Sequence, residues 1–159
     1  MSVDPDTFRA ALGRFATGVT IVTVKDAAGT DCGMTVSAFS SVSLRPPLVM
    51  ASIGHDASMA PAMSNAMEFG VSILERGQEA LSRHFADPEA VRFGNVAVTR
   101  GSLTGVALMN DALAWLECRV VARHEAGDHT LYIGEVLSAD ARADHPLLYY
   151  RGGYAELDR

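Results

Sequence analysis

Apolar and polar residues are distributed along this chain in a way that predicts mostly β-strands. Residues Val19 to Val24 are all β-branched, which is typical of a strand. A turn-forming segment, Ala27 to Thr30, separates them from a second extended run that begins at Gly33. These two runs predict an early β-hairpin.

A second hairpin is predicted further along the chain, where apolar residues alternate with polar ones. In Leu113 to His124, the small and apolar residues Leu116 and Cys118 share one face, and Glu117 and Arg119 lie on the other. The returning strand is predicted over Thr130 to Leu137, with Gly127-Asp128-His129 at the tip. Three further strands are predicted over Leu48 to Ile53, Phe69 to Leu74 and Pro146 to Tyr150. The apolar run from Leu48 suits a strand buried on both faces, although its periodicity alone does not exclude a helix.

Helical spacing of apolar residues appears in three places. Asp4-Pro5 is a favourable helix start, and Phe8, Leu12 and Phe15 form a stripe that predicts a buried face, ending at Gly18. A short helix is expected from Ser58, as its cap, to Met67. Its methionines at positions 59, 63 and 67 are expected to fill the core. A third helix is predicted over Gln78 to Phe85.

This order of elements predicts a mainly β fold, an antiparallel barrel with two or three peripheral helices. Six or more strands occur without regular βαβ alternation, which disfavours a doubly wound sheet. The length of 159 residues predicts one domain over 1–159. Residues 87–105 are expected to be rich in loops.

Composition and charge exclude several functions. The formal charge of −6 disfavours a nucleic-acid surface. No run approaches the ~20 apolar residues of a membrane span, and Asp4 and Asp6 stand where a leader would be basic, so we expect a cytoplasmic protein without membrane contact. Cys32 and Cys118 form no C-x-x-C pair, and the five histidines form no helical pair, so no metal site is expected.

The most distinctive segment runs from Gly33 to Leu48. Its hydroxyl side chains alternate with apolar ones, and it ends in the pair Pro46-Pro47. Small side chains, hydroxyl groups and backbone N–H groups suit a flat, anionic ligand. The alternative is a serine-rich edge strand that runs into a loop. The hydroxyl residues are Thr35, Ser37, Ser40, Ser41 and Ser43.

Motifs of several common enzyme classes are missing. The sequence has no G-x-x-x-x-G-K-[ST], G-x-G-x-x-G, H-E-x-x-H or G-x-S-x-G. Phosphoryl transfer, a Rossmann dinucleotide site, a zincin and an α/β-hydrolase are therefore disfavoured. Hydride transfer between two cofactors remains open, because it needs positioned rings more than a catalytic acid or base.

Seven segments in order resemble the short-chain flavin reductase family, the reductase components of two-component flavin-dependent monooxygenases. In chain order, they are R-F-A-T-G-V-T-I-V-T from Arg14, the hydroxyl-rich segment from Gly33, L-V-M-A-S-I from Leu48, F-G-V-S-I-L from Phe69, Q-E-A-L-S-R-H-F-A from Gln78, G-D-H from Gly127 and P-L-L-Y-Y-R-G-G-Y from Pro146. The resemblance implies a flavin reductase-like Greek-key FMN-binding split barrel, usually a homodimer. It also implies a flavoprotein oxidoreductase that uses NADH or NADPH to reduce FMN or FAD, as free flavin, for a separate oxygenase component.

The resemblance also implies roles for particular residues. His129 would face the nicotinamide and position it, and is the one catalytic candidate; Tyr150 and Arg151 are weaker candidates for the same pocket. Flavin-binding positions would be Thr35, Val36, Ser37, Ala38, Ser40, Ser41, Ser52, Ile53, Ser58, Ser82, Arg83 and Phe85. Arg83 suits a phosphate, because a guanidinium can form paired, charge-assisted hydrogen bonds.

Alternatives remain for the function and for single residues. A non-catalytic flavin carrier or sensor would use the same barrel, and a related oxidase or deazaflavin-dependent reductase is a third reading. Arg83 could be an ordinary solvated helix charge, and His129 a surface residue after a turn. Ser72, Arg45 and His55 depart from the family pattern, which leaves the FMN or FAD preference open.

Overall fold

The main element of the fold is a seven-stranded antiparallel sheet, in a computed structural model that describes residues 1–158. Its strands are β2 (Thr20–Lys25), β3 (Asp31–Val36), β4 (Phe39–Leu44), β5 (Pro47–Gly54), β6 (Glu68–Ile73), β9 (Ala114–Ala126) and β10 (His129–Ala141). Their order across the sheet is β3-β2-β6-β9-β10-β5-β4. The predicted mainly β, antiparallel fold is confirmed.

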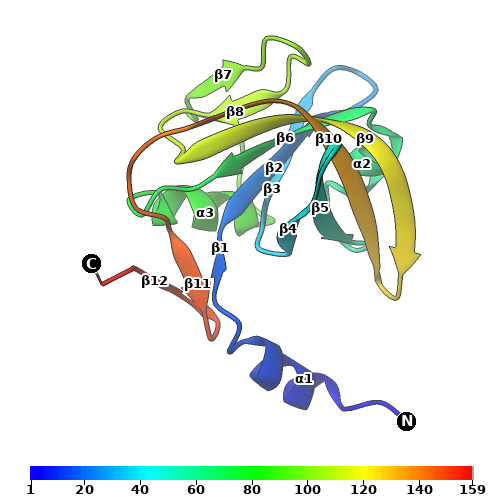
Figure 1. Cartoon of the computed structure of the whole chain (residues 1–159), viewed down its shortest axis with the longest axis vertical. Coiled ribbons are helices and arrows are strands. Elements are labelled where there is room, and N and C mark those ends of the chain that lie inside the picture. The colour runs from blue at the N-terminus through cyan, green and yellow to red at the C-terminus, as the bar shows by residue number, and fades with distance from the viewer. Residues whose placement is uncertain (159) are drawn as a thin grey trace.

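This sheet curls back on itself, because its two edge strands are neighbours in the sequence. β3 and β4 stand at opposite ends of the strand order, yet Ser37 and Ala38 alone separate them. Two residues span less than about 11 Å, so the two edges must come close together (Figure 1). The Ser52 N–H donates to the Ala38 carbonyl at 3.0 Å, and this hydrogen bond connects the Ser37–Ala38 link to β5. The result is a split barrel.

The smaller elements surround the barrel. One short sheet joins β1 (Thr17–Gly18), β11 (Leu148–Tyr150) and β12 (Gly153–Ala155), and another pairs β7 (Val98–Arg100) with β8 (Ala107–Met109). The helices are α1 (Pro5–Leu12), α2 (Ala60–Asn65) and α3 (Glu79–Ala86). Among residues 1–158, no helix is long and apolar enough to cross a membrane.

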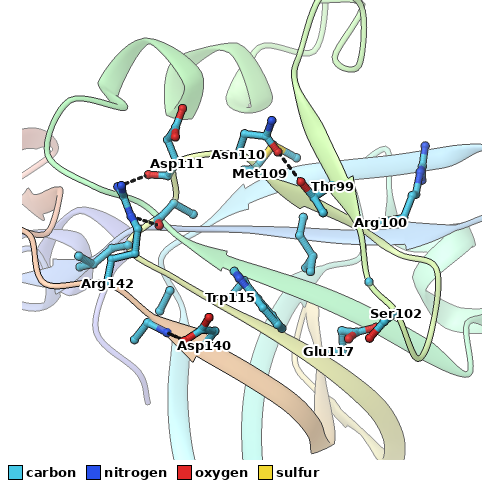
Figure 2. A pocket seen from close by; sticks show the side chains of 16 residues that line it. Thr99, Arg100, Ser102, Met109, Asn110, Asp111, Trp115, Glu117, Asp140 and Arg142 are labelled. Atoms are coloured by element: carbon cyan, nitrogen blue, oxygen red, sulfur yellow. Dashed lines mark hydrogen bonds between the residues drawn. The ribbon is translucent and has the colours of Figure 1, made fainter.

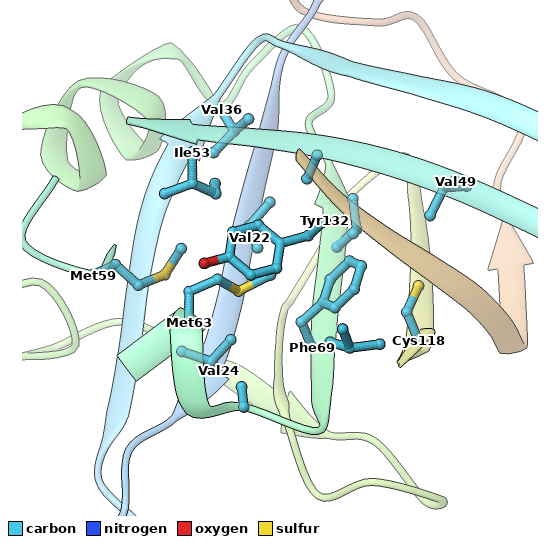
Figure 3. Close-up of a cluster of buried hydrophobic side chains, with 14 residues drawn as sticks. Val22, Val24, Val36, Val49, Ile53, Met59, Met63, Phe69, Cys118 and Tyr132 are labelled. Carbon is cyan, nitrogen blue, oxygen red and sulfur yellow. The ribbon is translucent and has the colours of Figure 1, made fainter. Parts of the chain in front are cut away.

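The barrel interior holds the larger of two hydrophobic clusters. Phe69, Tyr132 and Cys118 pack there with the aliphatic residues of β2 and β5 (Figure 3). Burial raises the pKa of the Cys118 thiol to about 12, so this cysteine is a packing residue, as expected. The smaller cluster contains Phe85 and lies under α3.

The predicted methionine positions on α2 are confirmed for two of three residues. Met59 and Met63 are buried in the barrel cluster, whereas Met67 is 69% exposed beyond the helix end. Ser58 does not cap this helix, because Met59 occupies the cap position and no side chain bonds to the first turn. The helix is too short to carry a third apolar turn.

The first helix differs from its prediction in length and burial. The Asp4 cap is confirmed, since its Oδ1 accepts from the Thr7 N–H at 2.9 Å. The helix ends at Leu12 and not at Gly18, because residues from Thr17 onward pair with β11. Its apolar stripe is not buried within this chain: Phe8 is 56% and Phe15 is 75% exposed. α1 extends away from the barrel (Figure 1).

Three strand predictions are also corrected. The hydroxyl-rich segment is not one strand, because the chain turns at Ser37 and Ala38 to reach the other edge of the sheet. β5 alternates between buried and half-buried residues, so one face lies in the barrel interior and the other is partly exposed, not both buried as expected. β12 is a strand that was not predicted, after the expected last strand; residues 87–105 are mostly loop, as expected, apart from the three-residue β7.

Candidate functional site

A hollow of about 200 Å³ lies where the sheet edge β3 meets the β11–β12 hairpin. Thr35 and Ser37, both predicted site residues, line it from β3 and from the link to β4. The other lining residues are Val19, Ala86, Tyr149 and Tyr154. Among residues 1–158, β3 has a sheet partner on one side only, so part of its backbone faces this region.

The two tyrosines of this hollow were not predicted as site residues. Tyr149 and Tyr154 are partners across the β11–β12 hairpin, and their rings meet edge to face at 5.5 Å. The sequence pattern did not predict β12, so it gave no reason to expect contact between these two rings. The contact between the two tyrosines depends on the strand register, which their spacing along the chain does not reveal.

Hydrogen bonds connect helix α3 to two residues that line this hollow. Thr35 Oγ1 donates to the Ser82 carbonyl at 2.6 Å, and Ser82 Oγ is hydrogen-bonded to Tyr154 Oη at 2.6 Å. Ser82 is fully buried, so its hydroxyl holds Tyr154 in place in this structure. The expected role of Ser82 in flavin binding stays a prediction.

Arg83 places a positive charge beside Tyr154, which is one of the residues that line this hollow. Its guanidinium lies 4.8 Å from the centre of the Tyr154 ring, and its Nε donates to Glu79 Oε2 at 3.0 Å. The side chain is 64% exposed, so its remaining N–H groups can reach a ligand. Stacking on Tyr154 restricts the guanidinium and favours a defined anion position.

A second group of predicted residues meets at one end of the β4–β5–β10 ribbon. Ala38 and Ser52 are joined by the backbone hydrogen bond described above, Ile53 is paired with Thr130, and Gly54 is paired with His129. A Cβ atom at Gly54 would meet His129 Nε2 at 3.5 Å, so the imidazole lies over this glycine. The link Ser37–Ala38 therefore joins the hollow to the strand ends that carry His129.

The hairpin tip that carries His129 is held by charged side chains. His129 Nδ1 donates to Asp128 Oδ1 at 2.8 Å, and this hydrogen bond lowers the pKa of the Asp128 carboxyl. His55, at the end of β5, contacts Glu125 at 2.8 Å, and its backbone N–H donates to the Asp128 carbonyl at 2.9 Å. The His129 side chain is 46% exposed, so part of the imidazole is accessible to a ligand.

Other predicted residues lie at some remove from this hollow. Ser40 and Ser41 continue along the exposed edge strand β4, where Ser40 Oγ donates to the Ser41 carbonyl. Ser58 lines a separate hollow of about 390 Å³ together with Arg92, whose guanidinium donates to the Gly33 carbonyl. Tyr150 follows Tyr149 and so points to the opposite face of β11.

Three predicted residues have side chains in the core. Val36, Ile53 and Phe85 are 4%, 1% and 0% exposed. A ligand could contact only their backbone.

A larger hollow, of about 540 Å³, lies on the outer face of β9 under the β7–β8 hairpin (Figure 2). Both of its arginines already have protein partners: Arg142 donates to the carbonyls of Asp111 and Ala112, and Arg100 forms a two-bond ion pair with Asp31. Glu117 lies on this outer face as expected but is fully buried, because the 101–104 loop covers it and donates to its Oε1. None of the predicted ligand-binding residues lines this hollow.

The curled sheet and the hollow at its open edge define a barrel protein with a candidate site for a small molecule. The family model described as "Flavin reductase like domain" matches residues 12–158. The chain belongs to this flavin reductase family.

Similar proteins support this membership over the whole chain. An "NADH-dependent flavin reductase" from Rhodococcus sp is 46% identical, with 98% of this chain and 88% of the relative covered. An "FMN reductase (NADH)" from Agrobacterium fabrum is 41% identical, with 96% and 86% covered. The solved NADH:FAD oxidoreductase of Streptomyces globisporus, in complex with NAD and FAD fragments, superposes with a TM-score of 0.91 at 40% identity, covering 99% of this chain and 96% of that one.

Proposed function

We propose that this protein is an NAD(P)H:flavin oxidoreductase that reduces FMN or FAD and supplies the reduced flavin to a separate monooxygenase. One structural observation carries the proposal: the curl of the sheet places Thr35, Ser37 and Ala38 beside the strand ends that hold His129. The names of the relatives support it, since they describe NADH-dependent reductases of flavin, FMN and FAD. The oxygenase partner is supported by BorF, a solved relative described as the flavin reductase component of a two-component tryptophan halogenase.

The residues present fit a flavin. The hollow is bordered by small hydroxyl side chains, by two aromatic rings and by the partly unpaired edge of β3, which can bond the polar rim of a heterocycle. Arg83 lies over the Tyr154 ring, and its exposed guanidinium can bind the phosphate. A bound flavin supplies the hydride-accepting ring, and the protein's contribution is to bind both cofactors, orient them and limit water.

The activity is tested by mixing the purified protein with FMN or FAD and with NADH or NADPH. We expect flavin-dependent loss of the reduced nicotinamide absorbance with at least one pair. Tight flavin binding without consumption of either donor would instead identify a flavin carrier or sensor. Measurement of all four pairs also establishes the flavin and donor preference.

His129→Ala is expected to raise the KM for the nicotinamide donor about tenfold and to change flavin affinity less than twofold. The imidazole lies over Gly54 at the accessible hairpin tip, so its removal affects the donor more than the flavin, and one lost polar contact is worth about 1–1.5 kcal/mol. Steady-state kinetics and flavin fluorescence titration measure the two effects.

His145→Ala, in the segment before β11, is the matched control and should leave both constants unchanged. Equal losses of donor and flavin binding in His129→Ala would contradict the assigned role.

The expected homodimer is part of the same proposal. The apolar stripe of α1 is exposed in the single chain, and a helix with no buried residue gains stability from an apolar partner surface. We expect Leu12→Glu to shift the protein from dimer to monomer in light-scattering chromatography. Ala10→Glu is the control, because Ala10 is exposed and residues two positions apart lie on opposite sides of a helix. A dimer that survives Leu12→Glu would place the interface elsewhere.

A cytoplasmic location also belongs to this proposal. Its support is that the reaction draws on reduced nicotinamide and that Cys32 and Cys118 are both free thiols.

A further inference from the structure

Three arginines surround a hollow of about 330 Å³ between the end of α1 and the β11–β12 turn. The hollow is lined by Arg9, Ala10, Gly13, Arg14, Arg151 and Gly152. The whole chain has 13 basic and 19 acidic residues, so a local group of three arginines is a marked departure from its average charge. Such a group attracts an anion.

Most of the positive charge at this hollow is not neutralised. Arg9 pairs with Asp6 at 3.2 Å, but within residues 1–158 neither Arg14 nor Arg151 takes part in an ion pair. One N–H of Arg14 donates to the Ala10 carbonyl at 2.9 Å, which restricts the guanidinium beside the hollow. The remaining donors of two arginines are accessible to a ligand.

Arg151 has a backbone conformation that is unfavourable for a residue with a side chain, which indicates that the arginine side chain has a role. Arg151 and Gly152 form the two-residue turn between β11 and β12, with φ of 53° and 76°. Asn-Gly or Gly-Gly suits such a turn better, because a left-handed conformation costs a residue with a Cβ about 1–2 kcal/mol. The Arg151 N–H donates to the Gly13 carbonyl at 2.9 Å, so the turn is fixed against the end of α1. The chain therefore has an arginine at a position where glycine would adopt the left-handed conformation at lower cost.

This hollow lies within reach of the flavin site. Tyr149 lines the smaller hollow beside Ser37, and Arg151 comes two residues later on the same strand and its turn. Two residues of chain span at most about 7 Å. A ligand whose ring lies beside Tyr149 could therefore place its phosphates among the arginines.

We propose that Arg14 and Arg151, with support from Arg9, bind the diphosphate bridge of the reduced nicotinamide dinucleotide. The inference rests on the proposed function and adds a subsite that selects donors with phosphates. Guanidinium groups form paired hydrogen bonds with phosphate oxygens, so the two arginines would anchor the donor without contacting its reacting ring.

The test compares NADH with reduced nicotinamide riboside, which has the same ring and ribose but no phosphate. In Arg14→Gln and Arg151→Gln, the KM for NADH is expected to rise about tenfold each, the effect of one lost charge-assisted bond. The KM for the riboside and the kcat with either donor should change less than twofold. Added salt should raise the NADH KM of the unaltered protein more than that of the variants.

Lys25→Gln, at the end of β2, removes one charge away from this hollow and should leave the NADH KM unchanged. A loss of equal size with the riboside would overturn the proposal, since a folding defect or a disturbed ring site does not distinguish the donors. A KM that rises for FAD but not for FMN or NADH would also overturn it and assign the arginines to the flavin diphosphate. A protein with no flavin-dependent activity on either donor would refute the proposed function itself.

Discussion

Ser37→Tyr is expected to weaken FMN and FAD binding at least about a hundredfold, which corresponds to about 2.7 kcal/mol. Ser37 lines the hollow of about 200 Å³ between β3 and the β11–β12 hairpin, and a phenol ring there would occupy the space proposed for the flavin. The hollow is bounded by Tyr149 and by Tyr154, which is held by its bond to Ser82, so it cannot widen easily. Titration of flavin fluorescence and the steady-state KM for flavin measure the effect.

Ser64→Tyr is the matched control for this substitution. Ser64 is exposed on α2, and its hydroxyl donates to the Pro61 carbonyl within the same helix. The control should bind flavin normally, and circular dichroism should show both variants folded. Unchanged flavin binding by a folded Ser37→Tyr protein would mean that the flavin does not occupy this hollow.

Gly134→Ala is expected to lower the free energy of unfolding by about 3 kcal/mol, the upper part of the range for overpacked cores. A Cβ atom at Gly134 would lie 2.5 Å from Cζ of Phe69 and 3.1 Å from Cβ of Cys118. Phe69 is fully buried in the barrel cluster, where its ring lies among other buried side chains (Figure 3). For a chain of this length, the melting temperature should fall by about 6–12 °C.

Gly18→Ala provides the comparison for this loss of stability. Nothing lies within 4 Å of a Cβ atom at Gly18, so thermal unfolding should be within about 1 kcal/mol of the unaltered protein. Equal stability of the two variants would show that the barrel interior is packed less tightly than the structure indicates. The test is independent of flavin binding, because it is made by calorimetry on the protein alone.

The elements with strong local patterns were predicted well from the sequence. The β-branched run at β2, the alternation along β9 and β10, the Asp4 cap of α1 and the G-D-H tip are all present in the structure. Each depends on side chains close together in the chain. Boundaries that depend on distant contacts were predicted poorly: α1 ends early because the chain must pair with β11, and the hydroxyl-rich segment breaks because it crosses from one sheet edge to the other.

Parts of the candidate site were also visible in the sequence, and other parts were not. Thr35, Ser37 and His129 stood out from their residue types and their resemblance to a family. Tyr149 and Tyr154 could not be found, because strand register pairs them across the sequence between them. The burial of Ser82 and Phe85 likewise depends on how α3 lies against β3, which the amphipathic pattern of the helix does not specify.

By itself, the amino-acid sequence determined that this protein is a mainly β barrel with the hydroxyl groups and the hairpin histidine of a flavin reductase, because strand patterns and motifs are local. Only the tertiary structure decided where those groups meet. The two-residue link between β3 and β4 closes the sheet, and strand register then places Ser37, Tyr154 and the His129 hairpin around one edge of the barrel. These are long-range contacts, and their geometry comes from the packing of the whole sheet.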